Sequence, residues 1–271
     1  MDAVFGLGHL HHVFSRRDRE RIVLSAIDAG FTQFDLAPAY GDGMTEREVG
    51  RCLCRRDVAI TTKFGIPMRA IGELPAAVYF GIRAAGKALR RSFGATYDKR
   101  DFSPKCLRES LASSLRRLRR EGVDCLLIHE PLSLDQFRAL VPTWQELERL
   151  QRVGTIRRFG VSGPGALLLE ADDLGLIPPA AVRMLSMDDR VCNLPATWFQ
   201  DKEVRIFGIV RRLSRTLGPG RLDPAVLVDR FRANLPHAAP VFSTCRIDEI
   251  KRLAQAIQSQ PANHDPMRIA P

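Results

Sequence analysis

Residues 20–36, ERIVLSAIDAGFTQFDL, hold one complete unit of the fold that the sequence predicts. The apolar Val23 and Ile27 lie about one helical turn apart, as in a helix that packs one face against a sheet. Gly30 follows as a helix stop, and the β-rich run from Thr32 to Leu36 predicts a short strand. The unit is therefore an amphipathic helix that leads through a glycine into a strand.

Short apolar runs and amphipathic stretches alternate in the same way along the whole chain. The predicted strands are Val4 to Leu7, Thr32 to Leu36, Val58 to Thr62, Cys125 to Ile128, Ile156 to Val161, Val182 to Met187, Val204 to Val210 and Pro240 to Phe242. Strands that alternate with helices form parallel βαβ units, and eight such units in 271 residues match the size of one α/β barrel. We predict an α/β protein with a (β/α)8 TIM-barrel fold, in which residues 1–271 form a single domain.

Capping residues mark two of the helix starts between these strands. Ser103 before Pro104 places a cap ahead of a proline at the first helical position. Thr45 and Glu48 have the spacing of a capping box, in which two side chains bond the first backbone N–H groups of a helix. The sequence therefore predicts helices that begin just after Ser103 and just after Thr45.

Two segments and the tail depart from the regular alternation. A long insertion of about residues 64–102 follows the third strand, far beyond a normal βα loop, and it contains Tyr79 and Tyr97. We predict that it forms a lid or wall over an active site, and that the segment from Val191 to Lys202 flanks the same opening. The tail of about residues 258–271 is expected to be frayed.

Composition limits the classes of partner. The chain is 45% hydrophobic and 27% charged, and it contains neither an apolar run of about 20 residues nor a basic N-terminal leader. We therefore expect a cytoplasmic protein without a membrane partner, present as a monomer or small homo-oligomer. The net charge of +10 comes from scattered arginine doublets without interleaved aromatic residues, which favours solvated helix faces over a nucleic-acid partner.

Reactive side chains gather at the ends of the second, third and fourth predicted strands. Asp35 and Tyr40 follow the second strand, Lys63 ends the third and His129 ends the fourth. In a (β/α)8 barrel the active site lies at the C-terminal ends of the strands, so neighbouring strands bring these groups to one side of the opening. We predict that the four residues form a catalytic site.

The acidities of these groups suggest a proton-transfer reaction. The pKa of a free tyrosine is about 10, and a neighbouring ammonium such as that of Lys63 is expected to lower the pKa of Tyr40. Asp35 would hold Lys63 in place and keep it protonated, while His129 orients the substrate oxygen or relays the proton. Such a site can protonate an alkoxide as it forms from a carbonyl, and it contains no obvious nucleophile.

These motifs resemble those of the aldo-keto reductases over nearly the whole chain. The matching features are an Asp separated by four residues from a Tyr-Gly pair, a Thr-Lys strand end, a strand ending in Ile-His, SLASSLRRL at residues 110–118 and GTIRRFGVS at residues 154–162. The resemblance implies that NADPH or NADH passes hydride to the carbonyl carbon of a small molecule while Tyr40 protonates the oxygen. The substrate would be an aldehyde, a ketone or a sugar lactol or lactone, and the reverse oxidation is equally allowed.

The resemblance also implies a set of cofactor contacts, with departures from the family pattern. The expected cofactor-binding residues are Gly8, Ser162, Gly163, Ser186, Ser243, Thr244 and Arg246. Gly163 replaces a family Asn, and the family's Gln on strand six is absent in the neighbourhood of Ser186 and Met187. Glu249 would repel a 2′-phosphate and Arg246 would compensate, which gives NADPH a slight preference over NADH.

Two alternatives remain open. The altered cofactor residues permit a cofactor-binding regulatory barrel, or one without catalytic activity. His9 and His11 after the first strand have the His-x-His spacing of metal-dependent hydrolase barrels. The ends of strands five, six and eight offer Ser162, Met187 and Ser243 in place of the further ligands that such hydrolases need, so we expect no metal ion.

Overall fold

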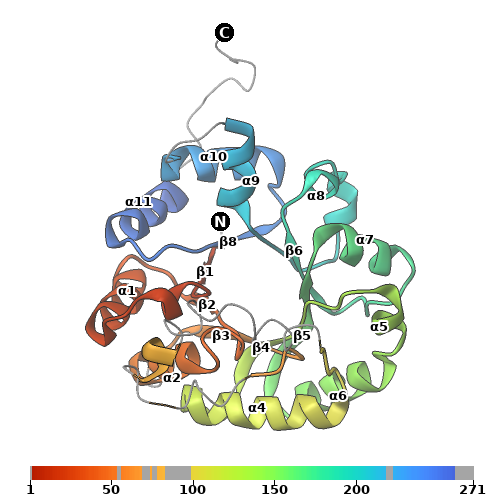
Figure 1. Ribbon diagram of the computed structural model, residues 1–271. Coiled ribbons are helices and arrows are strands. Elements are labelled where there is room, and N and C mark those ends of the chain that lie inside the picture. The colour runs from red at the N-terminus through yellow and green to blue at the C-terminus, as the bar shows by residue number, and fades with distance from the viewer. Residues whose placement is uncertain are drawn as a thin grey trace.

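The structure is a computed structural model, and it describes residues 2–53, 56–68, 74, 78–82, 99–217 and 222–259. Its strands are all parallel, each pairs with the next, and β8 returns to β1, so that they close into a barrel (Figure 1). The predicted (β/α)8 fold is confirmed.

The strands are β1 (Val4–Gly6), β2 (Gln33–Asp35), β3 (Ala59–Phe64), β4 (Val123–His129), β5 (Ile156–Gly163), β6 (Val182–Ser186), β7 (Val204–Phe207) and β8 (Ala239–Phe242). The α-helices are α1 (Arg16–Asp28), α2 (Met44–Leu53), α4 (Pro104–Leu118), α5 (Leu134–Arg138), α6 (Val141–Arg152), α7 (Gly165–Asp173), α8 (Asp189–Cys192), α9 (Ile209–Leu217), α10 (Pro224–Asn234) and α11 (Ile247–Gln258). Within the described residues, the short 3-10 helices are η1 (Leu10–His12) and η4 (Ala196–Phe199).

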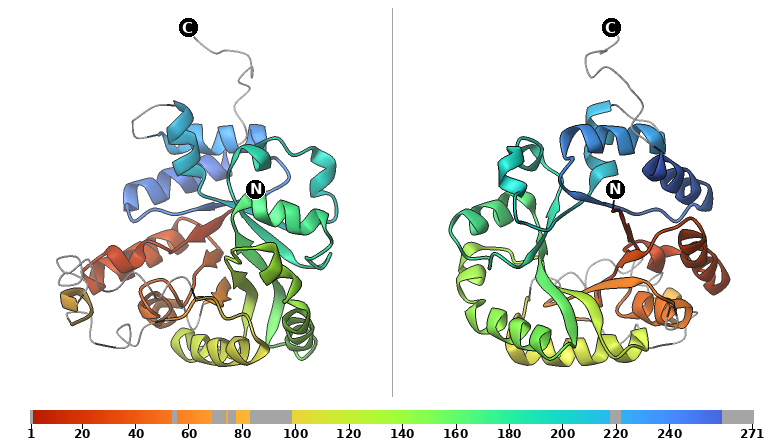
Figure 2. Two further views of the ribbon diagram at one scale, coloured as in Figure 1. Left: turned by 45° about the vertical axis from the view of Figure 1, so that its right-hand side comes forward. Right: turned by 180° about the vertical axis from the view of Figure 1, so that it is seen from behind.

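The strands bury side chains on both faces. Successive side chains of a strand point to opposite sides, so one set packs under the surrounding helices and the other fills the barrel interior. The helices form a continuous ring outside the strands, as the view from behind in Figure 2 also shows. The interior holds a small cluster of buried side chains, namely Val4, Cys125, Leu127, Val182, Met184 and Val241. The barrel is thus a packed core, with its polar groups at its two ends.

The seventh strand is shorter than predicted. Its predicted range of Val204 to Val210 is wrong, because β7 ends at Phe207 and α9 begins at Ile209. Gly208 between them has a φ of 75°, a left-handed conformation that ends the strand and favours glycine. The apolar Ile209 and Val210 therefore form the first turn of a helix. The other seven predicted strands agree with the structure to within two residues at each end.

One predicted helix start is confirmed and the other is wrong. Ser103 accepts a hydrogen bond from the backbone N–H of Cys106 and caps α4, with Pro104 in the first turn. Helix α2 begins at Met44, so Thr45 lies inside the helix and does not cap it. Its neighbour Glu46 is fully buried and serves a different purpose, described below.

The predicted insertion and tail are only partly described. Residues 69–73, 75–77, 83–98 and 260–271, which include Tyr97 and most of the tail, lie outside the described residues. The helical residues 78–82 pack Phe80 against Phe14, with ring centroids 4.9 Å apart, and place the fully buried Tyr79 beside Gly41. No helix in the described parts of the chain is long and apolar enough to cross a membrane.

Candidate active site

Lys63 on β3 stands at the centre of the polar cluster at the C-terminal end of the barrel. Its ammonium donates hydrogen bonds to both carboxylate oxygens of Asp35, at 2.6 and 2.7 Å, and to the backbone carbonyl of Leu36 at 2.8 Å. It also lies 3.2 Å from the hydroxyl oxygen of Tyr40. The Lys63 side chain is only 1% exposed, so these partners replace the water that a lysine normally holds.

Tyr40 is held by a tight turn between β2 and α2. Its N–H donates to the carbonyl of Ala37, and three residues in the left-handed region follow it, Gly41, Asp42 and Gly43. A Cβ atom at Gly41 would lie 2.5 Å from the Cβ of His11, so the turn needs glycine there for space as well as for conformation. The turn therefore fixes the direction in which Tyr40 points.

The Tyr40 ring lies between the other groups of the site. It meets the His129 ring edge to face, with centroids 5.9 Å apart, and the Lys63 ammonium lies 4.9 Å from its centroid. Gly8 borders the ring on another side, since a Cβ there would lie 3.6 Å from it. The structure thus brings together all four predicted catalytic residues: Asp35, Tyr40, Lys63 and His129.

A cavity of about 470 Å³ opens in front of Tyr40 and His129. It is lined by Gly6, Gly8, His9, Asp35, Tyr40, His129, Glu130, Ser162, Met184, Phe207, Gly208, Ile209, Val210, Arg211, Val241 and Ser243. Most of this lining is apolar, and the titratable groups converge on one part of it. That combination is typical of a binding site for a small molecule.

The pKa of Tyr40 differs from the prediction made from sequence. Burial raises the pKa of Tyr40 above its ordinary value of 10.0, and this outweighs the lowering effect of Lys63. Burial alone would lower the pKa of Lys63, but Asp35 and Tyr40 reverse this and raise that pKa above 10.5. Tyr40 is therefore held protonated at neutral pH, in the form that can donate a proton.

His129 is held in its neutral form. Burial, with the nearby charges of Lys63 and Arg100, lowers the pKa of His129 well below 6.5. A neutral imidazole can donate one hydrogen bond from its ring N–H and accept another. His129 is therefore suited to orienting an oxygen atom in the cavity at neutral pH.

Glu46 on α2 supports β3 from outside the barrel. Its carboxylate accepts a hydrogen bond of 2.6 Å from the Thr62 hydroxyl, and it pairs at 2.7 Å with Arg117 on α4. Since Thr62 precedes Lys63 and the two side chains point to opposite faces, the strand is held on both sides at the position of the lysine. Glu46 thus ties α2, β3 and α4 together behind the site.

Three of the seven predicted cofactor residues line the cavity: Gly8, Ser162 and Ser243. Ser162 is the penultimate residue of β5, where it pairs with His129 of β4, and it is 3% exposed. Ser243 lies after β8, and its hydroxyl is 3.2 Å from Nδ1 of His9, so the two residues connect the loops after β8 and β1.

The other four predicted cofactor residues lie away from the cavity lining. A side chain at Gly163 would first meet Leu168 of α7. The Ser186 hydroxyl accepts a hydrogen bond from the Gly165 N–H at the start of the same helix. At the start of α11, the hydroxyl of Thr244 donates to Glu249 at 2.5 Å, and Arg246 is an ion-pair partner of Asp248 and Glu249 at 3.7 and 3.6 Å. Ser186 and Thr244 thus each form a hydrogen bond within the protein, and the exposed Arg246 side chain lies near two carboxylates.

His9 and His11 are directed to different neighbours. His9 reaches Ser243, whereas His11 packs its Cβ toward Gly41 and its ring against His12, with centroids 4.0 Å apart. Among the described residues, no group of three or more His, Cys, Asp or Glu side chains is arranged to hold a metal ion. The geometry thus gives the hydrolase alternative no support.

Sequence reasoning missed one wall of the cavity. Residues 207–211 line it, and they were assigned to a strand or left without a role. Phe207 presents a half-buried aromatic ring there, and Arg211 in the first turn of α9 adds a positive charge near the helix N-terminus. Gly208, inside an apparent strand, was the signal that the chain changes direction at this point.

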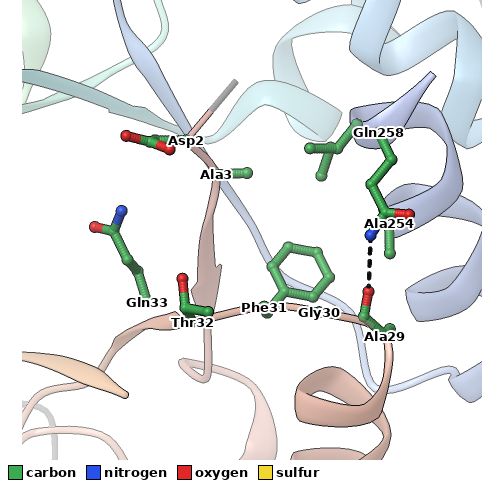
Figure 3. Close-up of a pocket in the computed structure, with 10 residues that line it drawn as sticks. Asp2, Ala3, Ala29, Gly30, Phe31, Thr32, Gln33, Ala254 and Gln258 are labelled. Carbon is green, nitrogen blue, oxygen red and sulfur yellow. Dashed lines mark hydrogen bonds between the residues drawn. The ribbon is translucent and has the colours of Figure 1, made fainter. Parts of the chain in front are cut away.

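A second cavity, of about 270 Å³, lies at the opposite end of the barrel (Figure 3). It is formed by the residues before β1 and β2 and by the end of α11, where Gln258 donates to the carbonyl of Ala29 at 3.4 Å. Asp2 is its one titratable lining residue in the described chain. The cavity in front of Tyr40 is therefore the candidate active site.

Comparisons with known proteins identify the family of the chain. Residues 3–186 match the Aldo/keto reductase family. The chain is 27% identical over 275 residues to a D-threo-aldose 1-dehydrogenase from a Pseudomonas species, covering 93% of this chain and 78% of that protein. It is 31% identical over 150 residues to an NADH-specific methylglyoxal reductase from Escherichia coli K12, covering 53% and 40% of the two chains.

Solved structures show the same fold. An aldo-keto reductase from Bacillus halodurans in its holo form superposes with a TM-score of 0.71 at 21% identity, covering 96% of this chain and 88% of that one. An aldo-keto reductase from Klebsiella pneumoniae in complex with NADPH gives a TM-score of 0.67 at 19% identity, covering 96% and 87%. The chain therefore belongs to the aldo/keto reductase family and is an NAD(P)H-dependent oxidoreductase.

Proposed function

We propose that this protein interconverts a small carbonyl compound and its alcohol, with Tyr40 as the group that donates or accepts the proton. The observation that carries the proposal is the contact of the Lys63 ammonium with both Asp35 and the Tyr40 hydroxyl, beside His129 at the wall of a cavity. A substrate oxygen in that cavity can receive the Tyr40 proton while Lys63 stabilises the tyrosinate that remains.

The residues present fit a nicotinamide cofactor on one side of the cavity. Phe207 offers an aromatic surface for a flat ring, and Ser162 and Ser243 offer hydroxyl groups. Arg211 and the first turn of α9 offer positive charge for phosphate groups. When bound, the cofactor supplies or accepts the hydride.

The protein's own residues complete the reaction. His129, neutral because of its burial, orients the substrate oxygen toward the Tyr40 hydroxyl. Asp35 keeps Lys63 charged and in place, so that the ammonium faces the tyrosine throughout. The apolar part of the lining excludes water from the reacting atoms.

Aldehydes, simple ketones and sugars are the proposed substrate class. We base this substrate class on the cavity volume of about 470 Å³ and on the names of the two relatives, one an aldose dehydrogenase and one a methylglyoxal reductase. Either NADPH or NADH serves in this proposal. The slight preference for NADPH inferred from sequence depends on the positive charge of Arg246. Because Asp248 and Glu249 both lie near that charge, they reduce its attraction for a 2′-phosphate.

The test is the Tyr40→Phe variant. It removes the proton donor and keeps the ring, so turnover of a reactive aldehyde should fall by about 10²- to 10⁴-fold while NAD(P)H still quenches the tryptophan fluorescence. Tyr79→Phe is the matched control, since Tyr79 is buried beside Gly41 without lining the cavity, and its turnover should stay within about threefold of wild type.

Two results would separate this proposal from its alternative. Equal turnover in wild type and Tyr40→Phe would remove Tyr40 from the proposed role. Cofactor binding by the wild type without turnover of any aldehyde, ketone or sugar would favour the cofactor-binding barrel without catalytic activity. The four predicted cofactor residues that lie away from the cavity are the observation that keeps that alternative open.

A further inference from the structure

Glu130 places a negative charge at the cavity wall next to the reacting groups. Within the described chain, the acidic residues that line the cavity are Asp35 and Glu130. The Asp35 side chain is 7% exposed and is bonded to Lys63, whereas the Glu130 side chain is 42% exposed. Of the two carboxylates, it is therefore Glu130 that a molecule in the cavity would meet.

The backbone of Glu130 is held in an unusual conformation. Its φ of 55° lies in the left-handed region, which strains the backbone of a residue that has a side chain. Its N–H donates to the carbonyl of Ser162 at 2.7 Å, and its own carbonyl accepts from Nε of Arg100 at 3.3 Å. These bonds fix the backbone from both sides, so the direction of the side chain is set by the fold.

The positive partner of Glu130 lies behind it. Nη2 of Arg100 is 3.7 Å from the Glu130 carboxylate, and the Arg100 side chain is 7% exposed. Arg100 does not line the cavity, whereas Glu130 does. A bound molecule would therefore face the carboxylate of this ion pair, with the guanidinium on its far side.

The charge of Glu130 reaches the reacting groups. After burial and the charges of Lys63 and Asp35, Glu130 contributes to raising the pKa of Tyr40. On the other side of the barrel, beyond β5 and β6, Arg211 lines the same cavity with a positive charge. The cavity thus has a negative wall next to His129 and a positive wall at the start of α9.

We propose that Glu130 determines substrate specificity, by excluding carbonyl compounds that carry a carboxylate or phosphate near the reacting group and admitting uncharged ones. The repulsion acts across a partly apolar cavity, where a like charge costs more than in water. The same carboxylate can accept hydrogen bonds from hydroxyl groups, which favours hydroxylated neutral substrates such as sugars. This inference rests on the proposed function, because it concerns the substrate of the same site.

The experiment compares two aldehydes of similar shape, 4-formylbenzoate and its methyl ester, by their kcat/KM values with NADPH and with NADH. The wild type should prefer the neutral ester, and Glu130→Gln should reduce this preference by about tenfold. Glu148→Gln is the matched control, because it removes the same charge from an exposed position on α6 and should leave the preference unchanged.

A second variant tests whether a change of preference in Glu130→Gln comes from a folding defect. Glu130→Asn keeps a polar side chain that tolerates the left-handed backbone, and its thermal unfolding should match that of the wild type. It should show the same loss of preference as Glu130→Gln. An unchanged preference in a folded variant that still reduces the ester would overturn the proposal.

Binding separates this proposal from the proposed function. If the wild type reduced neither aldehyde, the proposed function would fail for this class of substrate. The charge inference would then be judged by calorimetry with the corresponding alcohols, 4-(hydroxymethyl)benzoate and its methyl ester. Tighter binding of the ester, lost in Glu130→Gln, supports the inference, and equal Kd values for the two alcohols in the wild type contradict it.

Discussion

The barrel buries a cation near each of its two ends, and of these two, Lys63 and Arg205, it is Lys63 that contacts residues lining the cavity. At the C-terminal end, Lys63 bonds Asp35 at 2.6 and 2.7 Å. Nearer the N-terminal end, Arg205 on β7 bonds Glu203 at 2.7 and 3.1 Å and the Thr61 hydroxyl at 2.7 Å. The Lys63 and Arg205 side chains are equally hidden, at 1% and 2% exposed.

What differs between the two ends is the neighbour of each cation. Lys63 contacts the Tyr40 hydroxyl, which carries a proton and adjoins a cavity. Arg205 lies among packed side chains, near the fully buried Cys125, whose pKa burial raises to about 11. A buried ion pair therefore does not mark an active site by itself. An active site is indicated instead by a proton-bearing group that lies beside the ion pair and that a ligand can reach.

The largest expected effect comes from removing each cation in turn. Lys63→Met leaves the Asp35 carboxylate buried without its partner, so we expect the unfolding free energy to fall by about 3–5 kcal/mol and turnover by about 10²-fold or more. Arg205→Met should lower the unfolding free energy by only about 1–3 kcal/mol, because Glu203 is 36% exposed and still forms an ion pair with Arg158. Its turnover should be unchanged. Urea unfolding and aldehyde reduction measure the two effects.

A comparable loss of turnover in both variants would break this comparison. It would show that the two ends are coupled through β3, which carries both Thr61 and Lys63. Unchanged turnover in Lys63→Met, in a protein that remains folded, would remove the lysine from the proposed reaction.

A smaller effect is expected from pH. Reduction needs Tyr40 in its protonated form, and burial raises its pKa above 10.0. The pKa of His129 is well below 6.5, so His129 stays neutral from that pH upward. The rate of reduction should thus be level from about pH 6.5 to about pH 9 and fall only as Tyr40 loses its proton at higher pH, while oxidation should become faster in that range.

The pH profile of kcat is the measurement, at saturating cofactor and in both directions. A descending limb of reduction centred near neutral pH would mean that burial does not control Tyr40. The difference between the two ends of the barrel would then need another explanation, because the accessible, protonated Tyr40 is what distinguishes the Lys63 end from the Arg205 end.

The smallest effect concerns Ser186, a polar group at the C-terminal end that does not itself line the cavity. Its hydroxyl accepts from the Gly165 N–H at the start of α7, so Ser186→Ala should lower the unfolding free energy by about 1 kcal/mol. The Kd for NADPH and NADH, measured by fluorescence, should be unchanged. Clearly weaker cofactor binding by Ser186→Ala would show that Ser186 contacts the cofactor.

The sequence was sufficient to predict that Asp35, Tyr40, Lys63 and His129 lie together, because the barrel topology alone brings them to one place. Asp35, Lys63 and His129 each lie at the C-terminal end of a strand, and consecutive parallel strands end at the same side of the barrel. No side-chain detail was needed to bring them together. The position of Tyr40 followed in the same way, from the short turn after β2.

The errors arose where a local pattern has two possible structures. The apolar residues Ile209 and Val210 suit a buried strand and a buried helix equally well, and only the left-handed Gly208 decides between them. Ser186 and Thr244 stay predicted cofactor contacts, which were assigned by their positions along the chain. Their hydrogen-bond partners depend on side-chain direction and on neighbouring elements, which one sequence does not reveal.

The sign of the Tyr40 pKa shift is an error of another kind. Lys63 lowers that pKa, as predicted, but burial raises it more. The two effects have opposite signs, and both are electrostatic. Their balance therefore depends on how much water reaches the Tyr40 hydroxyl. That quantity exists only in the folded molecule.

The support of β3 from both sides also has a consequence for folding accuracy. Thr62 bonds Glu46 in the helix layer, and Lys63 bonds Asp35 inside the barrel. If β3 paired with its neighbours one residue out of register, the lysine would point into the helix layer and the threonine into the barrel. Both buried carboxylates would then lose their partners, so a misaligned strand is penalised by the same contacts that hold Lys63 beside Tyr40.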